Sequence, residues 1–264
     1  MKKCALYTIL IAAMLIACTG NSGDTPASTG DTFTETSRQS TFVLDSASEN
    51  SPKYECSLSI KTITGKDKQR EAKINGAILR TIFGDGEMAL GAAMDTLLAA
   101  ISGDYYDLYP EYINEKHINE KAPWFNFTYS LRTNVEYGRQ GTIIYEIYNY
   151  THNVGSDPKH TYTYLNFDPV SGEEIHLCDI FKEGCEEYLC NRLTDALADK
   201  IGANSRKEIK EKGYLTFNDI YPTENFLLKK DSIQFFYNTY DIATVDQGTT
   251  VLGFTYSELA EIMK

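Results

Sequence analysis

The fold is decided by the stretch Phe125-Asn-Phe-Thr-Tyr-Ser-Leu-Arg-Thr-Asn-Val-Glu-Tyr137, in which apolar and polar residues alternate with a period of two. Neighbouring side chains of a β-strand point to opposite faces, so this alternation predicts a strand with one face on a core and the other in water. Such one-sided burial is typical of an antiparallel sheet.

Two more strands are expected directly after this one. Gly138-Arg-Gln-Gly141 supplies a turn, and residues 142–150 return as a second strand. After a loop that contains Asp157-Pro158, residues 159–167 form a third strand. The middle of the chain is therefore predicted to be an antiparallel meander.

Helices are expected upstream of the meander. A first strand, residues 54–63, precedes apolar residues at helical spacing that end at Gly84-Asp-Gly86. A second helix is predicted between Leu90 and Ile101. A third, between Tyr105 and Ile113, is less regular because it contains Pro110.

Downstream of the meander, a helix is predicted from Cys185 to Ile201 and a hairpin from residues 232–237 and 249–253. Thr255-Tyr-Ser-Glu258 is a capping box and predicts a C-terminal helix. The predicted fold class is α+β. N-terminal helices pack with an antiparallel sheet and are followed by an antiparallel meander, a helix, a hairpin and a C-terminal helix.

The first eighteen residues have the order of a bacterial export signal. Lys2 and Lys3 form a positive n-region, and residues 6–16 form an apolar h-region that is too short to span a bilayer. Leu15-Ile-Ala-Cys18 resembles a lipobox, whose cysteine thiol receives diacylglycerol before the signal is cut. We therefore expect a signal peptide at 1–17 and a mature lipoprotein that begins at Cys18. The alternative is an ordinary signal peptide in which Cys18 is incidental.

Lipid on Cys18, such as palmitate, would hold the protein durably in the cell envelope. Thr19 at the second mature position resembles the sorting signal for the outer membrane, so the expected location is that membrane, facing the periplasm or the cell surface.

Behind the cysteine, Ser, Thr, Gly, Asp and Asn dominate the sequence, so residues 18–52 are predicted to be a flexible tether. Asp45-Ser46-Ala47 within it resembles a short bacterial acceptor pattern for O-glycans. The rest of the chain is divided into an N-terminal half, residues 53–150, and a C-terminal half, residues 151–264, that share a core.

Charge limits the class of partner. Without Lys2 and Lys3, 23 basic residues stand against 37 acidic ones, a net charge of −14. Nucleic acid and anionic lipid headgroups reward a basic surface and are therefore not expected as partners. A cationic partner would be favoured, although acidity also keeps a protein soluble.

Four cysteines remain after Cys4 and Cys18 are set aside: Cys56, Cys178, Cys185 and Cys190. In an oxidising compartment an even set allows disulfides, and buried free thiols are the alternative. We expect Cys178 to pair with Cys185 or Cys190 rather than with Cys56, because these three lie within thirteen residues. No paired Cys-x-x-Cys spacing supports a tetrahedral zinc site, so neither a metal nor another cofactor is predicted.

A family resemblance lies in two segments. The first is Tyr162-Thr-Tyr-Leu-Asn-Phe-Asp-Pro-Val-Ser-Gly-Glu-Glu-Ile-His-Leu-Cys-Asp-Ile-Phe181. The second is Phe235-Phe-Tyr-Asn-Thr-Tyr-Asp-Ile-Ala243, followed by Gly248 and by Phe254-Thr-Tyr-Ser-Glu-Leu259. Together they resemble the extracellular module of RsiV anti-sigma factors and the accessory module of PdaC deacetylases.

The resemblance implies a binding module without enzymatic activity of its own, since the RsiV module is a sensor that binds lysozyme. The family's Gly-Gly-Ala-His-Gly turn is replaced here by Asn153-Val-Gly-Ser-Asp157, so ligand contacts through that loop are expected to differ from those of the family.

A search for catalytic residues points the same way. His117, His152, His160 and His176 are scattered, and the sequence has no Gly-x-Ser-x-Gly elbow, P-loop or dinucleotide fingerprint. His152 and His160 flank one loop and could meet, but two imidazoles without a third ligand make a poor metal site. The favoured hypothesis is a non-enzymatic binding lipoprotein for a basic, lysozyme-like protein or an envelope component. The alternative is a cell-wall hydrolase or transferase whose site is hidden in the sequence.

Overall fold

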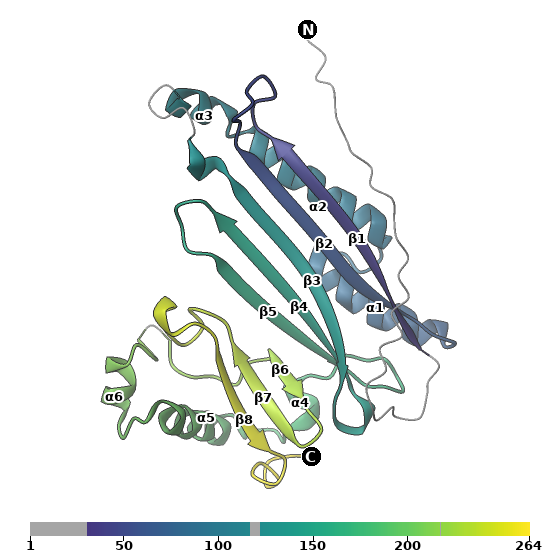
Figure 1. Cartoon of the computed structure of the whole chain (residues 1–264). Helices are drawn as coiled ribbons and strands as arrows, with labels where there is room; N and C mark the ends of the chain where they lie inside the picture. Colours follow the sequence, from purple (N-terminus) through teal and green to yellow (C-terminus); the bar gives the residue numbers. More distant parts are fainter. Residues whose placement is uncertain (1–30, 117–121, 217) are drawn as a thin grey trace.

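The computed structural model describes residues 31–116, 122–216 and 218–264. It places them in two β-sheets, each accompanied by helices (Figure 1). The predicted α+β class is confirmed.

The five-stranded large sheet has its strands in chain order. They are β1 (Thr32–Val43), β2 (Lys53–Thr64), β3 (Phe127–Tyr137), β4 (Ile143–Asn153) and β5 (Lys159–Phe167). All neighbours are antiparallel except β2 and β3, which are parallel. A parallel pair needs a long crossover connection, and three helices between β2 and β3 provide it. The sheet is therefore mixed, whereas an antiparallel sheet had been expected from the sequence.

The crossover helices cover one face of the large sheet. They are α1 (Lys68–Phe83), α2 (Leu90–Tyr106) and α3 (Tyr109–Lys116). Ile74 and Ile78 of α1 are fully buried against β4 and β5, and Met94 of α2 is fully buried against β2. The Asp67 side chain caps α1 by accepting from two backbone N–H groups, and Gly84 ends it in the left-handed conformation.

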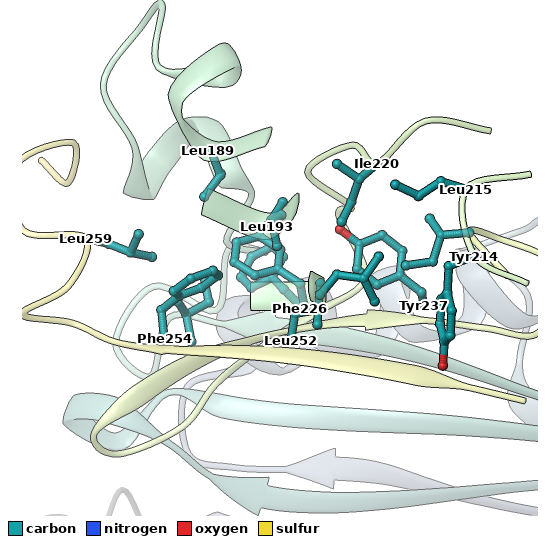
Figure 2. Packing of buried hydrophobic residues seen from close by; sticks show 14 of the residues in the cluster. Leu189, Leu193, Tyr214, Leu215, Ile220, Phe226, Tyr237, Leu252, Phe254 and Leu259 are labelled. Atoms are coloured by element: carbon teal, nitrogen blue, oxygen red, sulfur yellow. The ribbon is translucent and has the colours of Figure 1, made fainter. Parts of the chain in front are cut away.

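The small sheet is antiparallel and consists of β6 (Phe226–Leu228), β7 (Ser232–Tyr237) and β8 (Thr250–Thr255). The helices α4 (Leu177–Ile180), α5 (Glu186–Ile201) and α6 (Arg206–Glu211) precede it in the chain. Figure 2 shows Leu189 and Leu193 of α5 directed at the small sheet, above Phe226, Leu252 and Phe254. This core closes one face of the small sheet.

Three asparagines join the two sheets. The Asn166 side chain donates to the Phe226 carbonyl at 2.8 Å and accepts from the Leu228 N–H at 3.0 Å. Along the outer edge of β5, the N–H groups of Tyr162 and Tyr164 donate to the side chains of Asn238 and Asn225. Side-chain amides thus replace the missing neighbouring strand.

A glycine permits close approach at the same junction. A Cβ on Gly138, which follows β3, would lie 1.8 Å from the carbonyl oxygen of Leu228. Only glycine fits where this turn, with its short 3-10 helix η2 (Arg139–Gly141), meets β6. The turn therefore fixes the small sheet against the end of β3.

Part of the predicted tether is a strand. Residues 32–43 form β1, which pairs with the whole of β2, although composition had placed them in a flexible segment. An edge strand needs backbone pairing more than apolar side chains, and only Phe33 and Phe42 pack partly against the core. The predicted division at residues 150 and 151 lies inside β4, so the large sheet runs through it.

The predicted C-terminal helix is wrong. The capping box does form, with the Thr255 N–H donating to the Glu258 carboxylate at 2.7 Å, but only turns come after it. Instead the Lys182 N–H donates to the Ile262 carbonyl, and the Lys264 N–H donates to the Ile180 carbonyl. These bonds hold the last residues beside the end of α4.

Smaller elements were not anticipated. The predicted hairpin has a third strand, β6, and the helices α4 and α6 were missed. So were the 3-10 helices η1 (Pro123–Phe125) and η3 (Val245–Gln247). All of these are too short to show a period in the sequence.

Candidate binding surface on the open face of the large sheet

The face of the large sheet opposite the crossover helices carries aromatic side chains. Strand register puts Tyr148 opposite Tyr162 and Tyr150 opposite His160. Side chains two residues apart share a face, so these four rings lie together. The tightly buried residues of the same strands, such as Tyr145 and Ile147, belong to the helix-covered face.

We call the continuous row of rings the aromatic ladder. Neighbouring centroids along it are 4.9 to 6.5 Å apart, within the range of attractive aromatic pairs. Its members are His152, Tyr150, His160, Tyr148, Tyr162, Tyr164 and Phe236. The ladder begins near the β4–β5 loop and ends where β7 packs on β5.

The middle of the ladder is held by two polar contacts. The Arg132 guanidinium lies 4.2 Å from the Tyr148 ring centroid, a cation–π contact from β3. The Tyr148 hydroxyl oxygen lies 2.8 Å from Nδ1 of His160. Burial and the neighbouring Tyr162 raise the pKa of Tyr148, so its hydroxyl keeps its proton at neutral pH and can donate to the imidazole.

The ladder ends in a cavity of about 230 Å³ that we call the intersheet cleft. Residues from both sheets line it, among them Asn134, Glu136, Glu146, Lys229, Gln234 and Phe236. Lys229 forms an ion pair with Glu136. The Tyr164 hydroxyl donates to the Glu146 carboxylate at 3.1 Å. Burial, reinforced by Glu146, raises the pKa of Tyr164 far above its usual value, so its hydroxyl keeps its proton at neutral pH.

Two further cavities lie elsewhere. One of about 350 Å³ is on the helix side of the large sheet, lined by Tyr129, Asn149 and threonines of β4 and β5. Another of about 540 Å³ is next to α6, lined by residues such as Lys212, Tyr214 and Asp246. Neither joins a row of aromatic rings, so the open face is the better candidate for a binding surface.

The two histidines singled out in the sequence do share the open face. His152 and His160 both contact Tyr150, which lies between them. In the described parts of the chain, no three His, Cys, Asp or Glu side chains are grouped so that they could hold a metal ion. The three cavities include neither histidine in their linings. His117 lies outside the described residues.

The disulfide candidates lie near the small sheet. Cys178 is exposed in α4, Cys185 precedes α5 and Cys190 is within α5, while Cys56 is buried in the core of the large sheet. All four are free thiols. Burial raises the pKa of Cys56 to about 12 and also raises the pKa of Cys190. The pairing of Cys178 with Cys185 or Cys190 stays a prediction.

The signal peptide and Cys18 lie outside the described residues. Among the helices of residues 31–116, 122–216 and 218–264, none has the length and apolarity needed to cross a membrane. Ser46, in the O-glycan-like pattern, is exposed in the turn between β1 and β2.

Sequence reasoning missed most of the ladder. The available signal was the pair of Tyr-x-Tyr repeats, Tyr148-Asn-Tyr150 in one strand and Tyr162-Thr-Tyr164 in the next. The two tyrosines of each repeat must share a face of their strand, and the register of β4 with β5 puts both pairs on the same face of the sheet. Phe236 gave no such signal because it reaches the ladder from a different sheet.

Comparisons with solved structures show where this fold occurs. A DUF3298 family member from Bacteroides fragilis superposes with a TM-score of 0.80 at 22% identity, over 90% of this chain and 95% of that one. A DUF3298 family protein from Pseudomonas aeruginosa superposes with a TM-score of 0.56 at 16% identity, over 87% of this chain and 94% of that one. No curated protein matches the sequence.

A family model matches the sequence over residues 178–257, which begin within α4 and end two residues after β8. The family is described as a protein family of unknown function, DUF3298. The C-terminal part of the chain is thus similar in sequence to the DUF3298 family, and most of the chain shares its fold with two solved structures of that family.

Proposed function

We propose that this chain is a non-enzymatic binding lipoprotein of the cell envelope. Lipid on Cys18 holds it at a membrane, and the open face of the large sheet captures a ligand. The ligand is a basic protein, with lysozyme-like enzymes as the first candidates. A component of the envelope itself is the other ligand class.

The observation that carries the proposal is the aromatic ladder with Arg132 beside it. Tyrosine, tryptophan and arginine are the residues most enriched among energetic hot spots of protein interfaces. The rings stand on paired strands and contact one another, so little side-chain entropy is lost when a partner covers them. His160 is exposed and Tyr150 and Tyr162 are half-buried, which leaves part of the ladder available.

Charge supports a basic ligand. The net charge of −14 expected for the mature chain would accelerate the encounter with a cationic protein. Electrostatic steering acts mainly on the association rate, which falls as salt is added. We therefore expect a strongly salt-dependent association rate and a less sensitive dissociation rate.

The resemblance to RsiV and PdaC modules supports the same class of ligand. The β4–β5 loop that departs from the family pattern, residues 153–157, comes directly after His152. It therefore stands at one end of the ladder. We expect this chain to differ from RsiV modules in which lysozyme, or which other basic protein, it prefers.

The Tyr148–His160 pair supports binding better than catalysis. A general base needs a nucleophile within reach and a third group that orients it. Within the described chain, His160 contacts the rings of Tyr148 and Tyr150 and the Tyr148 hydroxyl. We propose that the pair stiffens the ladder.

Surface plasmon resonance tests the proposal. The full-length chain, purified in detergent, is immobilised and exposed to c-type and other lysozymes at low and physiological salt. We expect saturable binding that weakens in Tyr150→Ala. It should persist in the control Tyr188→Ala, an exposed tyrosine of α5 on the other side of the small sheet. No saturable binding at either salt would remove the basic-protein ligand, and turnover of a peptidoglycan fragment would favour the cell-wall enzyme.

Lipid attachment is tested separately. We expect Cys18→Ala to abolish labelling with radioactive palmitate and to release the protein from membrane fractions. Equal labelling of the wild type and the variant would overturn the lipobox assignment.

A further inference from the structure

The intersheet cleft contains a carboxylate, that of Glu146, which has no cationic partner among the described residues. Of its two glutamates, Glu136 is neutralised by Lys229. Across the described residues, no Lys, Arg or His side chain forms an ion pair with Glu146. The two glutamates and one lysine together leave one net negative charge in the lining. A half-buried carboxylate is costly unless charge or hydrogen bonds compensate it.

Arg132, a cation on the same face, is already engaged elsewhere. It lies over Tyr148, whereas Glu146 is opposite Asn134, one step further along the strands. One Glu146 oxygen accepts from the Tyr164 hydroxyl at 3.1 Å, and this bond orients the carboxylate. The other oxygen has no hydrogen bond within the described chain and can accept one from outside.

The walls of the cleft suit an aliphatic stem that ends in a cation. Phe236 and Tyr164 are 5.2 Å apart between centroids, and Val251 and Leu227 complete the apolar side. Lys and Arg side chains bury their methylene groups along apolar surface and keep the charged head at a polar group. An aromatic wall also attracts the cation itself. The Asn134 and Gln234 amides line the same cavity and offer further acceptors.

From these contacts we propose that the intersheet cleft is a subsite for one Lys or Arg side chain of a protein ligand, with Glu146 as its acceptor. The inference rests on the proposed function and deepens it. The ladder provides contact area, and the cleft at its end selects a cationic residue of the ligand. Both Lys and Arg can donate to the open Glu146 oxygen, and the planar guanidinium of Arg can also stack on the aromatic wall.

Nuclear magnetic resonance tests the cleft independently of any protein ligand. The probes are acetyl-Gly-Arg-Gly-amide, its Lys analogue and its citrulline analogue, titrated onto the ¹⁵N-labelled full-length chain in detergent. Citrulline keeps the shape of arginine but loses its charge. We expect saturable shifts of the Glu146, Leu227 and Gln234 amides with Arg and Lys, and binding weaker by about tenfold or more with citrulline.

Variants separate the cleft from the rest of the surface. Glu146→Gln should abolish these shifts, whereas Glu55→Gln, an exposed acid on β2, should leave them unchanged. Gln234→Trp fills the cleft without changing its charge and should also abolish them, which keeps the test valid if Glu146→Gln misfolds. The backbone spectrum itself reports folding.

The outcomes distinguish the two proposals. Equal binding of citrulline and arginine, or shifts confined to other regions, would overturn the subsite. If lysozyme binds both the wild type and Glu146→Gln equally, the subsite is overturned and the proposed function stands. If no basic protein binds but the arginine peptide shifts the cleft amides, the proposed function fails while the subsite stands.

Discussion

The two sheets use their faces differently. One face of the small sheet is covered by α5, and Leu193 of that helix and Phe235 of the sheet belong to the same buried core. The other face packs against strands of the large sheet. The large sheet is covered by helices on one face, while beyond the intersheet cleft its other face presents the aromatic ladder. Apolar surface in the small sheet is buried on both faces, whereas in the large sheet part of it stays uncovered and is the surface that we propose for a ligand.

The match to the family model also separates the two sheets. The matched residues, 178–257, coincide with the small sheet and its helices. Every ladder residue except Phe236 lies before that range, on β4 and β5. The recognisable sequence pattern therefore describes a folding core, whereas the candidate recognition surface lies outside it.

The largest effect should come from the core of the small sheet. Leu193 of α5 is fully buried against the small sheet, and Leu193→Ala should lower the free energy of unfolding by about 2 to 5 kcal/mol, because a cavity is left behind. Urea unfolding measures it. The control Val170→Ala, at a residue 81% exposed, should change stability by about 0.5 kcal/mol or less. A small effect of Leu193→Ala would mean that this core is not tightly packed.

The second largest loss of stability is expected at the junction between the two sheets. Asn166→Ala leaves the Leu228 N–H and the Phe226 carbonyl without partners, which should cost about 1 to 3 kcal/mol. Asn191→Ala, on the exposed face of α5, is the control.

Asn166→Ala also tests whether the two sheets unfold together. Trp124, the only tryptophan, reports on the large sheet alone, while far-ultraviolet circular dichroism reports on both. We expect the two signals to coincide in the wild type and to separate in Asn166→Ala. Separate transitions already in the wild type would show that the junction does not couple the sheets.

The ladder should affect binding more than stability. Arg132→Ala removes an exposed cation–π contact, so the free energy of unfolding should fall by only about 0.5 to 1 kcal/mol. Affinity for a c-type lysozyme should fall by about tenfold in surface plasmon resonance. Arg206→Ala, on α6, is the charge-matched control. Unchanged affinity in Arg132→Ala would count against the open face as the binding surface.

The smallest effect on stability is expected at an ion pair between α3 and the turn after β1, and it should depend on pH. Lys116 of α3 donates to the Asp45 carboxylate at 2.9 Å and is the main reason that the pKa of Asp45 lies below its usual 3.8. Because the folded pKa is lowered, the pair stabilises the fold above pH 3.8, and this contribution is lost as the pH falls through the folded pKa.

Asp45→Asn should therefore cost up to about 1 kcal/mol at neutral pH, and the difference from wild type should vanish in acid. Trp124 fluorescence during urea unfolding at several pH values measures it. Asp95→Asn, which removes a more exposed pair with Arg38, should show a weaker effect. A difference that grows as the pH falls would contradict the assignment.

Sequence periodicity predicted the elements with regular burial. Residues 159–167 and 232–237 form strands with the predicted bounds, and the helix after Cys185 ends at Ile201 as expected. The strand β1 was not predicted because Ser and Thr occupy many of its positions. It is held by backbone pairing with β2, which amino-acid composition does not reveal. The capping box at Thr255 predicted a helix because local hydrogen bonds do form there, but pairing with Ile180 and Lys182 fixes the conformation of the last residues.

The candidate site was less predictable for a physical reason. Tyr148 and Tyr162 are fourteen residues apart and meet only through register, while Phe236 joins them through sheet packing. The sequence identified His152 and His160 as neighbours across a loop, and they do share one surface. Glu146 could not be singled out, because its lack of a cationic partner depends on where Lys229 and Arg132 point.

The asparagines along β5 also bear on aggregation. An exposed strand edge can pair with the edge strand of another molecule and so lead to aggregation. Here the N–H groups of Tyr162 and Tyr164 already donate to Asn238 and Asn225 at 2.7 and 2.8 Å. A second molecule would have to displace these amides before it could add a strand. The bonds that join the sheets therefore also protect this edge from self-association.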